Sequence, residues 1–372
     1  MSLLRLDISG LRNLQNTSLR QLSRINVIYG ENGSGKTSLL EAVHVLGMAR
    51  SFRSASIKPV VTHGQETCTV FGELHDAGSG LKTTLGVSRS RSGELDARVG
   101  GRPVAGRAAL ADALPLQVIH NDSFAVLTGA PVARRQFIDW GVFHVEPLFF
   151  DTWQRFQRAI KQRNNLLRRG KISPAELASW DAELAAAGET IDVARSRYVN
   201  ALTPAFVELA ARLDGAMPQL ELRYRRGWNS EQSLADALAQ GRGADIQQGF
   251  THSGPQRADL RVLADELPAA ECLSRGQLKL LICALKLAQG QLLQQAGKRC
   301  VYLIDDLTAE FDRRHASAVA NAVNDLQAQV FVTCIAESDV ESIWPRPVGA
   351  TPAAGELAMF HVEHGVIQHQ PG

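Results

Sequence analysis

The sequence predicts an α/β protein in which a core sheet carries an antiparallel β subdomain and an inserted helical lobe, without a long coiled coil. Three observations predict this fold: an apolar strand that runs into a glycine-rich loop, a second apolar strand that ends in paired acids, and a long helical stretch between them. We expect the two parts of the core at residues 1–130 and 246–372, and the helical lobe at residues 131–245.

Composition sets few limits on function. The 372 residues are 45% hydrophobic and 21% charged, and the formal net charge of +2 does not by itself indicate a nucleic-acid partner. The five cysteines are scattered without zinc-ligand spacing, which is typical of a reducing compartment. The strand-like start of the chain and the absence of a long apolar run favour a cytoplasmic protein without a membrane partner.

The glycine-rich loop is the strongest motif. Residues 25–29 form an apolar strand, residues 30–37 match the Walker A pattern GxxxxGK[ST], and residues 38–46 continue as a helix. Inward-pointing backbone N–H groups and the helix N-terminus bind phosphates, so the loop predicts ATP as a ligand. Lys36 is expected at the β- and γ-phosphates and Thr37 at Mg²⁺. The predicted nucleotide contacts of this segment are Gly30, Glu31, Asn32, Gly33, Ser34, Gly35, Lys36, Thr37 and Ser38.

A second motif lies near the C-terminus. Residues 300–304 form an apolar strand that ends in Asp305 and Asp306, which is the Walker B form. An aspartate at the carboxyl end of a buried strand can hold Mg²⁺, and the next carboxylate can orient the attacking water. Two acids after a strand can also form a simple turn. The Walker A loop makes the catalytic interpretation the better one, with Lys36, Asp305 and Asp306 as the catalytic residues.

The chain between the two motifs changes character along its length. Residues 66–104 read as short antiparallel strands, residues 116–120 as one more strand, and residues 134–213 as helices. We expect Gly170, Gly188 and Pro204 to interrupt the helices, which argues against a coiled-coil arm.

One of these helices carries a run of basic residues without an intervening acid, which could be a solvated helix face or a patch that contacts DNA phosphates. The run comprises Arg155, Arg158, Lys161, Arg163, Arg168, Arg169 and Lys171.

A third motif, residues 273–277, stands shortly before the acidic strand and reads Leu-Ser-Arg-Gly-Gln. It resembles the signature of ABC ATPases. That resemblance implies that Ser274, Gly276 and Gln277 contact the ATP of the opposite subunit in a head-to-tail homodimer. It also implies that Asp312 lies at the dimer seam and that Arg12 is a basic nucleotide contact, although an exposed loop arginine is an equal alternative for Arg12. Gln117 and Asn121 are the candidates for a Q-loop residue.

From end to end the chain resembles the RecF family of ABC/SMC-type ATPases, which act in DNA repair. The resemblance rests on residues 11–13, 51–53, 131–139, 163–164 and 253–260 and on the intermediate length of the insertion between Walker A and signature. It implies an ABC/SMC-like ATPase head with weak, DNA-stimulated ATPase activity. It also implies binding of double-stranded, gapped or junction DNA by an ATP-dependent homodimer, and cooperation with RecR and RecO proteins.

Departures from the ABC pattern suggest slow hydrolysis. Asp306 replaces the usual glutamate base, Cys334 and Ile335 stand where a switch histidine is expected, and Gln256 stands where RecF sequences more often have histidine. Two alternatives share the P-loop: the ATPase subunit of a membrane transporter and a small-molecule phosphotransferase.

Overall fold

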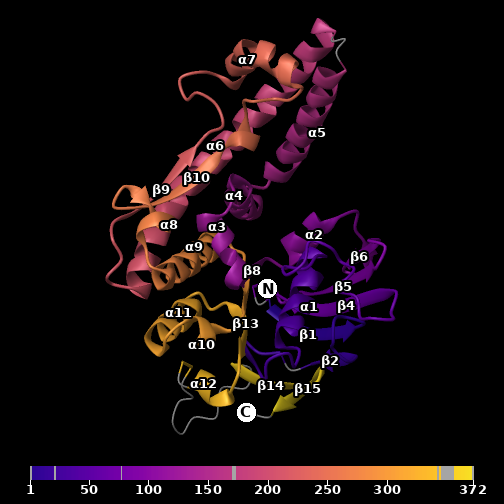
Figure 1. The fold of residues 1–372 in the computed structure, drawn as a ribbon. Helices are drawn as coiled ribbons and strands as arrows, with labels where there is room; N and C mark the ends of the chain where they lie inside the picture. Colours follow the sequence, from indigo (N-terminus) through magenta and orange to yellow (C-terminus); the bar gives the residue numbers. More distant parts are fainter. Residues whose placement is uncertain are drawn as a thin grey trace. The chain divides into compact units, whose positions relative to one another are not determined.

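The computed structural model describes residues 2–20, 22–76, 78–169, 173–341, 343–344 and 356–370, and Figure 1 shows it as a ribbon. The chain divides into two compact units. The first comprises Met1–Ser123, Arg212–Asp214 and Cys283–Gly372, and the second comprises Phe124–Ala211 and Gly215–Ile282. The second unit therefore extends further on both sides than the predicted lobe at residues 131–245 and includes the signature segment.

An antiparallel sheet of the first unit has the strand order β2-β1-β4-β5-β6-β7. Its strands are β1 (Ser2–Ser9), β2 (Thr17–Leu19), β4 (Thr67–His75), β5 (Lys82–Ser90), β6 (Leu95–Val99) and β7 (Arg102–Pro103). Alternate residues of β4 are buried, as expected for a sheet with one covered face. The predicted antiparallel strands between residues 66 and 104 are confirmed.

A second sheet of the first unit has the order β15-β14-β3-β13-β12-β8. Its strands are β3 (Ile25–Tyr29), β8 (Leu116–Ile119), β12 (Val301–Ile304), β13 (Gln329–Cys334), β14 (Leu357–Glu363) and β15 (Val366–Gln370). Neighbours pair in parallel except β14 and β15. The carboxyl ends of β3, β12 and β13 therefore meet at one edge, which brings the Walker A loop and the paired acids together.

Helix α1 (Lys36–Met48) contacts strands of both sheets. Nearly all of its residues are buried, which is expected of a helix that is covered on all sides. The Gln329 side chain also joins the sheets, because it accepts from the Leu3 N–H at 2.7 Å and donates to the Leu3 carbonyl at 2.8 Å. The other helices that lie wholly in the first unit are α2 (Arg107–Ala113), α10 (Leu307–Glu310), α11 (Arg313–Asp325) and α12 (Glu337–Glu341).

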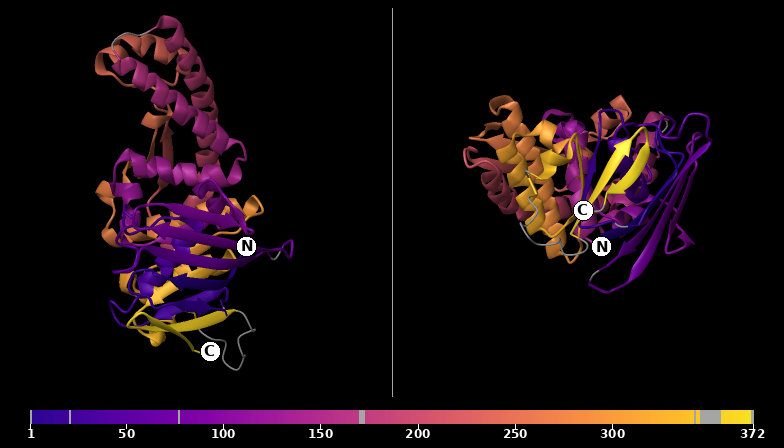
Figure 2. Two further views of the ribbon diagram at one scale, coloured as in Figure 1. Left: turned by 90° about the vertical axis from the view of Figure 1, so that its right-hand side faces the viewer. Right: turned by 90° about the horizontal axis from the view of Figure 1, so that it is seen from below.

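The second unit is mainly helical and carries a small antiparallel sheet of order β11-β10-β9. Its strands are β9 (Leu220–Arg225), β10 (Asp259–Ala264) and β11 (Leu267–Pro268). Its helices are α3 (Ala125–Thr128), α4 (Pro131–Val145), α5 (Phe149–Arg168), nearly all of α6 (Pro174–Leu213), α7 (Leu234–Gln248), α8 (Ala269–Cys272) and the start of α9 (Arg275–Gln295), with a short 3-10 turn at Pro255–Arg257. A second 3-10 turn, Asn121–Phe124, spans the boundary between the units in the sequence. Helices α5 and α6 lie side by side (Figures 1 and 2) and share the ion pair between Arg155 and Glu183.

Helix α6 corrects one prediction. It continues for 40 residues through Gly188 and Pro204, so neither residue breaks it. Gly188 is a packing position, because a Cβ added there would lie 2.4 Å from Leu234 Cδ2. Tertiary contact therefore outweighs the weak helix propensity of glycine. Helix α5 ends before α6 begins, as predicted, whereas Gly170 lies outside the described residues.

Candidate nucleotide-binding site

The Walker A loop connects the buried strand β3 to α1. Gly30, Gly33 and Gly35 have φ angles of 148°, 81° and 124°, which other residues rarely adopt. Lys36 is 5% exposed, and its Nζ donates to the carbonyls of Gly30 at 2.7 Å and Glu31 at 2.9 Å. The loop is thus curled around its own lysine, in the conformation that the motif predicts.

Asp305 meets α1 from the end of β12. The Thr37 hydroxyl donates to Asp305 Oδ1 at 3.1 Å, and the Thr333 hydroxyl donates to the same oxygen at 2.8 Å. Burial raises the pKa of the Asp305 carboxyl, while these hydroxyls oppose the rise and the neighbouring Asp306 charge adds to it. Thr37 and Asp305 offer hard oxygen ligands, so the pair fits the predicted Mg²⁺.

Asp306 adopts a left-handed conformation with φ 53°. Its backbone N–H donates to the Thr333 hydroxyl at 2.7 Å, so one threonine joins the two acids. Thr333 was not singled out from the sequence. The sequence pointed only to the next positions, Cys334 and Ile335, where a switch histidine is expected. Thr333 reaches the acids because β13 pairs with β12.

Lys36, Thr37 and Asp306 border a cavity of about 570 Å³. The residues that line it are Arg12, Asn13, Asn32, Gly33, Gly35, Lys36, Thr37, Ser38, Arg53, Lys58, Pro59, Val61, His63, Arg91 and Asp306. Among these described residues basic side chains outnumber the acidic one, Asp306, so the cavity suits a polyphosphate. The sequence did not predict the contributions of Asn13, Lys58, His63 and Arg91. These residues come from three separate segments, and folding alone brings them together.

Arg12 lines the cavity but is already paired. Its guanidinium donates two hydrogen bonds of 2.7 Å to the carboxylate of Glu41, whose side chain is 0% exposed. The alternative of an exposed loop arginine is wrong, because the Arg12 side chain is only 19% exposed. A contact between Arg12 and nucleotide stays a prediction.

Gln117 does not suit the role of Q-loop residue. It is 4% exposed, and its side chain bonds to Gln289 at 2.8 Å and Lys286 at 3.2 Å. These contacts occupy both ends of its amide, so the suggestion that Gln117 contacts nucleotide is wrong. The side chain of Asn121, the other candidate, lies outside the described residues.

The signature segment belongs to the second unit and forms a capping box at the start of α9. The Gln277 N–H donates to Ser274 Oγ at 3.3 Å, and the Ser274 N–H donates to Gln277 Oε1 at 3.1 Å. Ser274, Arg275 and Gly276 are exposed. The segment therefore presents the N-terminus of a 21-residue helix, with its positive end of the helix dipole, to solvent.

Most of the predicted basic run lies on the exposed face of α5. Arg155, Arg158, Lys161, Arg168 and Arg169 are exposed, and Lys171 lies outside the described residues. Arg155 pairs with Glu183 at 2.8 Å.

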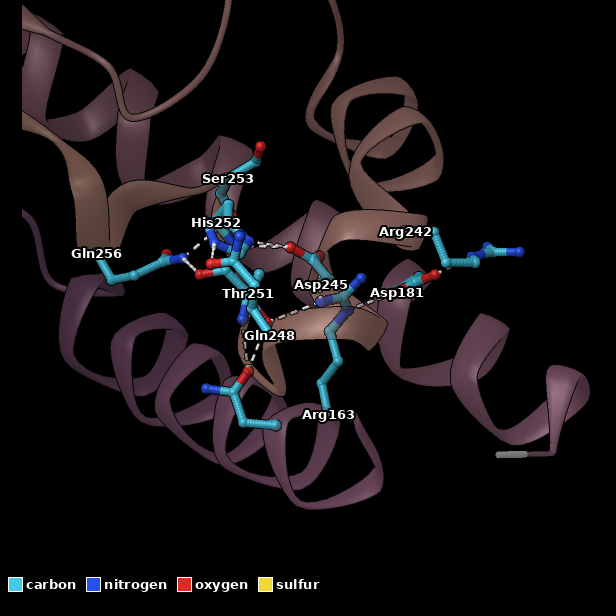
Figure 3. Close-up of polar contacts among 10 residues, drawn as sticks. Arg163, Asp181, Arg242, Asp245, Gln248, Thr251, His252, Ser253 and Gln256 are labelled. Atoms are coloured by element: carbon cyan, nitrogen blue, oxygen red, sulfur yellow. Dashed lines mark hydrogen bonds and ion pairs between the residues drawn. The ribbon is translucent and has the colours of Figure 1, made fainter. Parts of the chain in front are cut away.

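Arg163 is the exception and corrects the prediction of a DNA contact. It is 0% exposed and donates to Asp181 at 2.6 Å, Asp245 at 2.7 Å and Thr251 at 2.8 Å (Figure 3). Asp245 also accepts from the backbone N–H of His252 at 3.0 Å. Arg163 therefore joins α5 to α6 and to the end of α7, and it is not available to a phosphate.

Replacing Arg163 with alanine is expected to lower the free energy of unfolding by about 3–5 kcal/mol, because the buried Asp245 loses its arginine partner and Asp181 keeps only Arg242. Urea unfolding followed by circular dichroism measures this. Arg158→Ala on the exposed face of the same helix is the matched control, with an expected change within about 0.5 kcal/mol. Equal unfolding midpoints for the two variants would contradict a structural role for Arg163.

None of the helices in the described part of the chain combines the length and apolar character that a membrane crossing requires.

Comparison with known proteins identifies the family. Residues 2–356 match the family model of the RecF/RecN/SMC N-terminal domain. The chain is 49% identical over 368 residues to the DNA replication and repair protein RecF of Pseudomonas paraeruginosa. This alignment covers 99% of this chain and 97% of the relative. It is also 49% identical over 376 residues to RecF of Stutzerimonas stutzeri, in an alignment that covers 100% of this chain and 98% of that relative.

Solved structures agree on the fold. A structure of the recombination mediator protein RecF with ATP superposes with a TM-score of 0.86 at 22% identity, covering 99% of this chain and 97% of that one. An SMC head bound to the C-terminal winged-helix domain of ScpA gives a TM-score of 0.59 at 16% identity, covering 99% and 96%. The predicted ABC/SMC-like head is confirmed, and the chain belongs to the RecF family.

Proposed function

We propose that this protein is a RecF-type ATPase that binds DNA in recombinational repair and replication restart. Two chains close head-to-tail around ATP and clamp double-stranded or gapped DNA, slow hydrolysis releases it, and RecR and RecO proteins are the partners in loading recombinase at gaps. The observation that carries the proposal is the basic cavity in which the Walker A loop, Thr37 and Asp306 meet, with Asp305 hydrogen-bonded to Thr37. Family membership supports the DNA-repair context.

The residues of the cavity divide the chemistry between them. Lys36 and the N–H groups of the loop bind the β- and γ-phosphates. Thr37 and Asp305 hold Mg²⁺, which supplies positive charge to the phosphates when bound. Asp306 lines the same cavity and accepts hydrogen bonds from the attacking water. Its carboxylate is one methylene shorter than that of glutamate, which supports slow turnover.

The dimer follows from the signature. Among the described residues the Ser274 oxygen accepts the hydrogen bond of the capping box and its hydroxyl donates none, so the hydroxyl hydrogen can reach a further acceptor. A helix N-terminus with exposed N–H groups attracts the γ-phosphate of a second chain. ATP that bridges two chains stabilises their dimer by mass action.

DNA binding is tested by the salt dependence of affinity. The plot of log K against log salt has a negative slope, and each lost phosphate contact makes that slope less steep by about 0.9. We expect the triple variant Arg158→Ala, Lys161→Ala, Arg168→Ala to make that slope less steep by about 2–3 on gapped and duplex DNA with ATP. A control with the same charge loss, Lys82→Ala, Arg98→Ala, Arg102→Ala, removes exposed cations of the antiparallel sheet. Equal slopes for both triples would exclude α5 as the DNA contact, and no DNA binding by the unmodified chain at low salt would overturn the repair function.

The two alternative P-loop functions predict other results. A transporter subunit hydrolyses ATP without DNA and responds to a membrane partner. A phosphotransferase moves phosphate to an acceptor other than water. The full-length match to RecF relatives disfavours both.

A further inference from the structure

The turn of the C-terminal hairpin contacts the Walker A loop. Strands β14 and β15 are joined at His364 and Gly365, and the hairpin is drawn in yellow in Figure 1. The Gly365 N–H donates to the Ser34 carbonyl at 2.8 Å, and the Gly365 carbonyl accepts from the Gln15 N–H at 2.9 Å. Val362 of β14 is 0% exposed, and its carbonyl lies beside Gly30. The hairpin of β14 and β15 therefore contacts the loop at both Gly30 and Ser34.

The contact at Ser34 determines the orientation of one peptide. In a planar trans peptide the carbonyl and the following N–H point in opposite directions. Because Gly365 holds the Ser34 carbonyl on the hairpin side, the Gly35 N–H points the other way. Gly35 lines the cavity, so this N–H is directed at the place where phosphates are expected.

We propose that Gly365 is a positioning residue for phosphate binding, which it serves by fixing the Ser34–Gly35 peptide with the Gly35 N–H directed into the cavity. The inference rests on the proposed binding of ATP. Gly365 is not among the described residues that line the cavity. It acts through the P-loop peptide.

Only glycine fits this position. Gly365 has φ 79°, and a Cβ added there would lie 2.0 Å from the Asn13 carbonyl oxygen, a backbone atom that cannot move freely. His364 has φ 47°, so both central residues of the two-residue turn are left-handed. A side chain at 365 must push the turn away from Asn13 and lengthen the hydrogen bond to Ser34. Asn13 Nδ2 also donates to the Ser34 carbonyl, but at 3.4 Å. The peptide therefore relies mainly on Gly365.

A second hairpin provides a matched control. Gly101 lies in the two-residue turn between β6 and β7 and has φ 77°. Nothing lies within 4 Å of a Cβ added to Gly101. Gly365→Ala and Gly101→Ala therefore impose the same backbone strain, and only the first disturbs the P-loop.

The experiment measures the affinities of the full-length variants for ATP, ADP and AMP by competition with a fluorescent ATP analogue. Gly365→Ala is expected to weaken ATP and ADP about tenfold, the effect of one lost hydrogen bond, while AMP binding changes less than about twofold. Gly101→Ala is expected to bind all three like the unmodified protein. Unchanged ATP and ADP affinities in Gly365→Ala, or an equal loss for AMP, would overturn the proposal. Failure of the unmodified chain to bind ATP would instead overturn the proposed function.

Hydrogen exchange on the unmodified protein tests the same coupling if Gly365→Ala does not fold. ADP is expected to slow exchange of the amide in a peptide that contains Gly365, and AMP is not. No protection with ADP at saturating concentration would contradict the coupling.

Discussion

Replacing Lys36 with arginine is expected to lower the ATPase rate by about a hundredfold or more, and to abolish ATP-dependent dimerisation. Lys36 is buried, and a single nitrogen lies between two carbonyls at 2.7 and 2.9 Å. The planar guanidinium fork is wider and cannot place one nitrogen at that point, so charge alone does not restore the contact. Phosphate release with and without DNA measures the rate.

Lys58→Arg is the matched control for that substitution. Lys58 also lines the cavity but is exposed, so an arginine can be accommodated there with little change in rate. If Lys36→Arg retained the rate of the Lys58→Arg variant, the role of the Walker A lysine would be contradicted.

Replacing Ser274 with arginine is expected to leave ATP binding by the single chain intact and to prevent ATP-dependent dimerisation. The new side chain places bulk and positive charge where the γ-phosphate of a second chain is expected to dock, and it removes one side of the capping box. Loss of the cap alone costs about 1 kcal/mol of helix stability. Sedimentation velocity with and without ATP measures the dimer, and equilibrium titration measures nucleotide binding.

Ser233→Arg controls for the lost cap. Ser233 is the exposed N-cap of α7 and accepts from the Asp236 N–H at 3.1 Å. The Ser233→Arg variant should dimerise with ATP like the unmodified protein. Dimers of the Ser274 variant with ATP, at the concentration at which the control dimerises, would refute the sandwich arrangement.

Sequence patterns were sufficient wherever the chemistry is local. The Walker A loop and the strand that ends in Asp305 are each set by residues within a few positions of one another, so spacing alone predicts them. The antiparallel strands between residues 66 and 104 were predicted for the same reason. The capping box at Ser274 is equally local, but it was not predicted from the sequence.

Sequence patterns failed where distant segments decide the outcome. Arg163 carries the same charge as Arg158, and only the carboxylates on α6 and α7 make it a buried structural residue. Gly188 reads as a helix breaker until Leu234 packs against it. Thr333 and Gly365 act on the loop and the acids from the far end of the chain, and no spacing rule connects them to Gly30 or Asp305.

The most direct test of a composite site is to mix the two inactive variants. In a dimer of one Lys36→Arg chain and one Ser274→Arg chain, one site combines an unmodified Walker A loop with an unmodified signature, and the other site carries both changes. We expect mixing to restore ATP hydrolysis well above the sum of the two separate variants, with at most one ATP hydrolysed per mixed dimer in a single-turnover experiment. Hydrolysis no greater than the sum of the two separate variants, under conditions where the unmodified protein dimerises, would contradict the composite site.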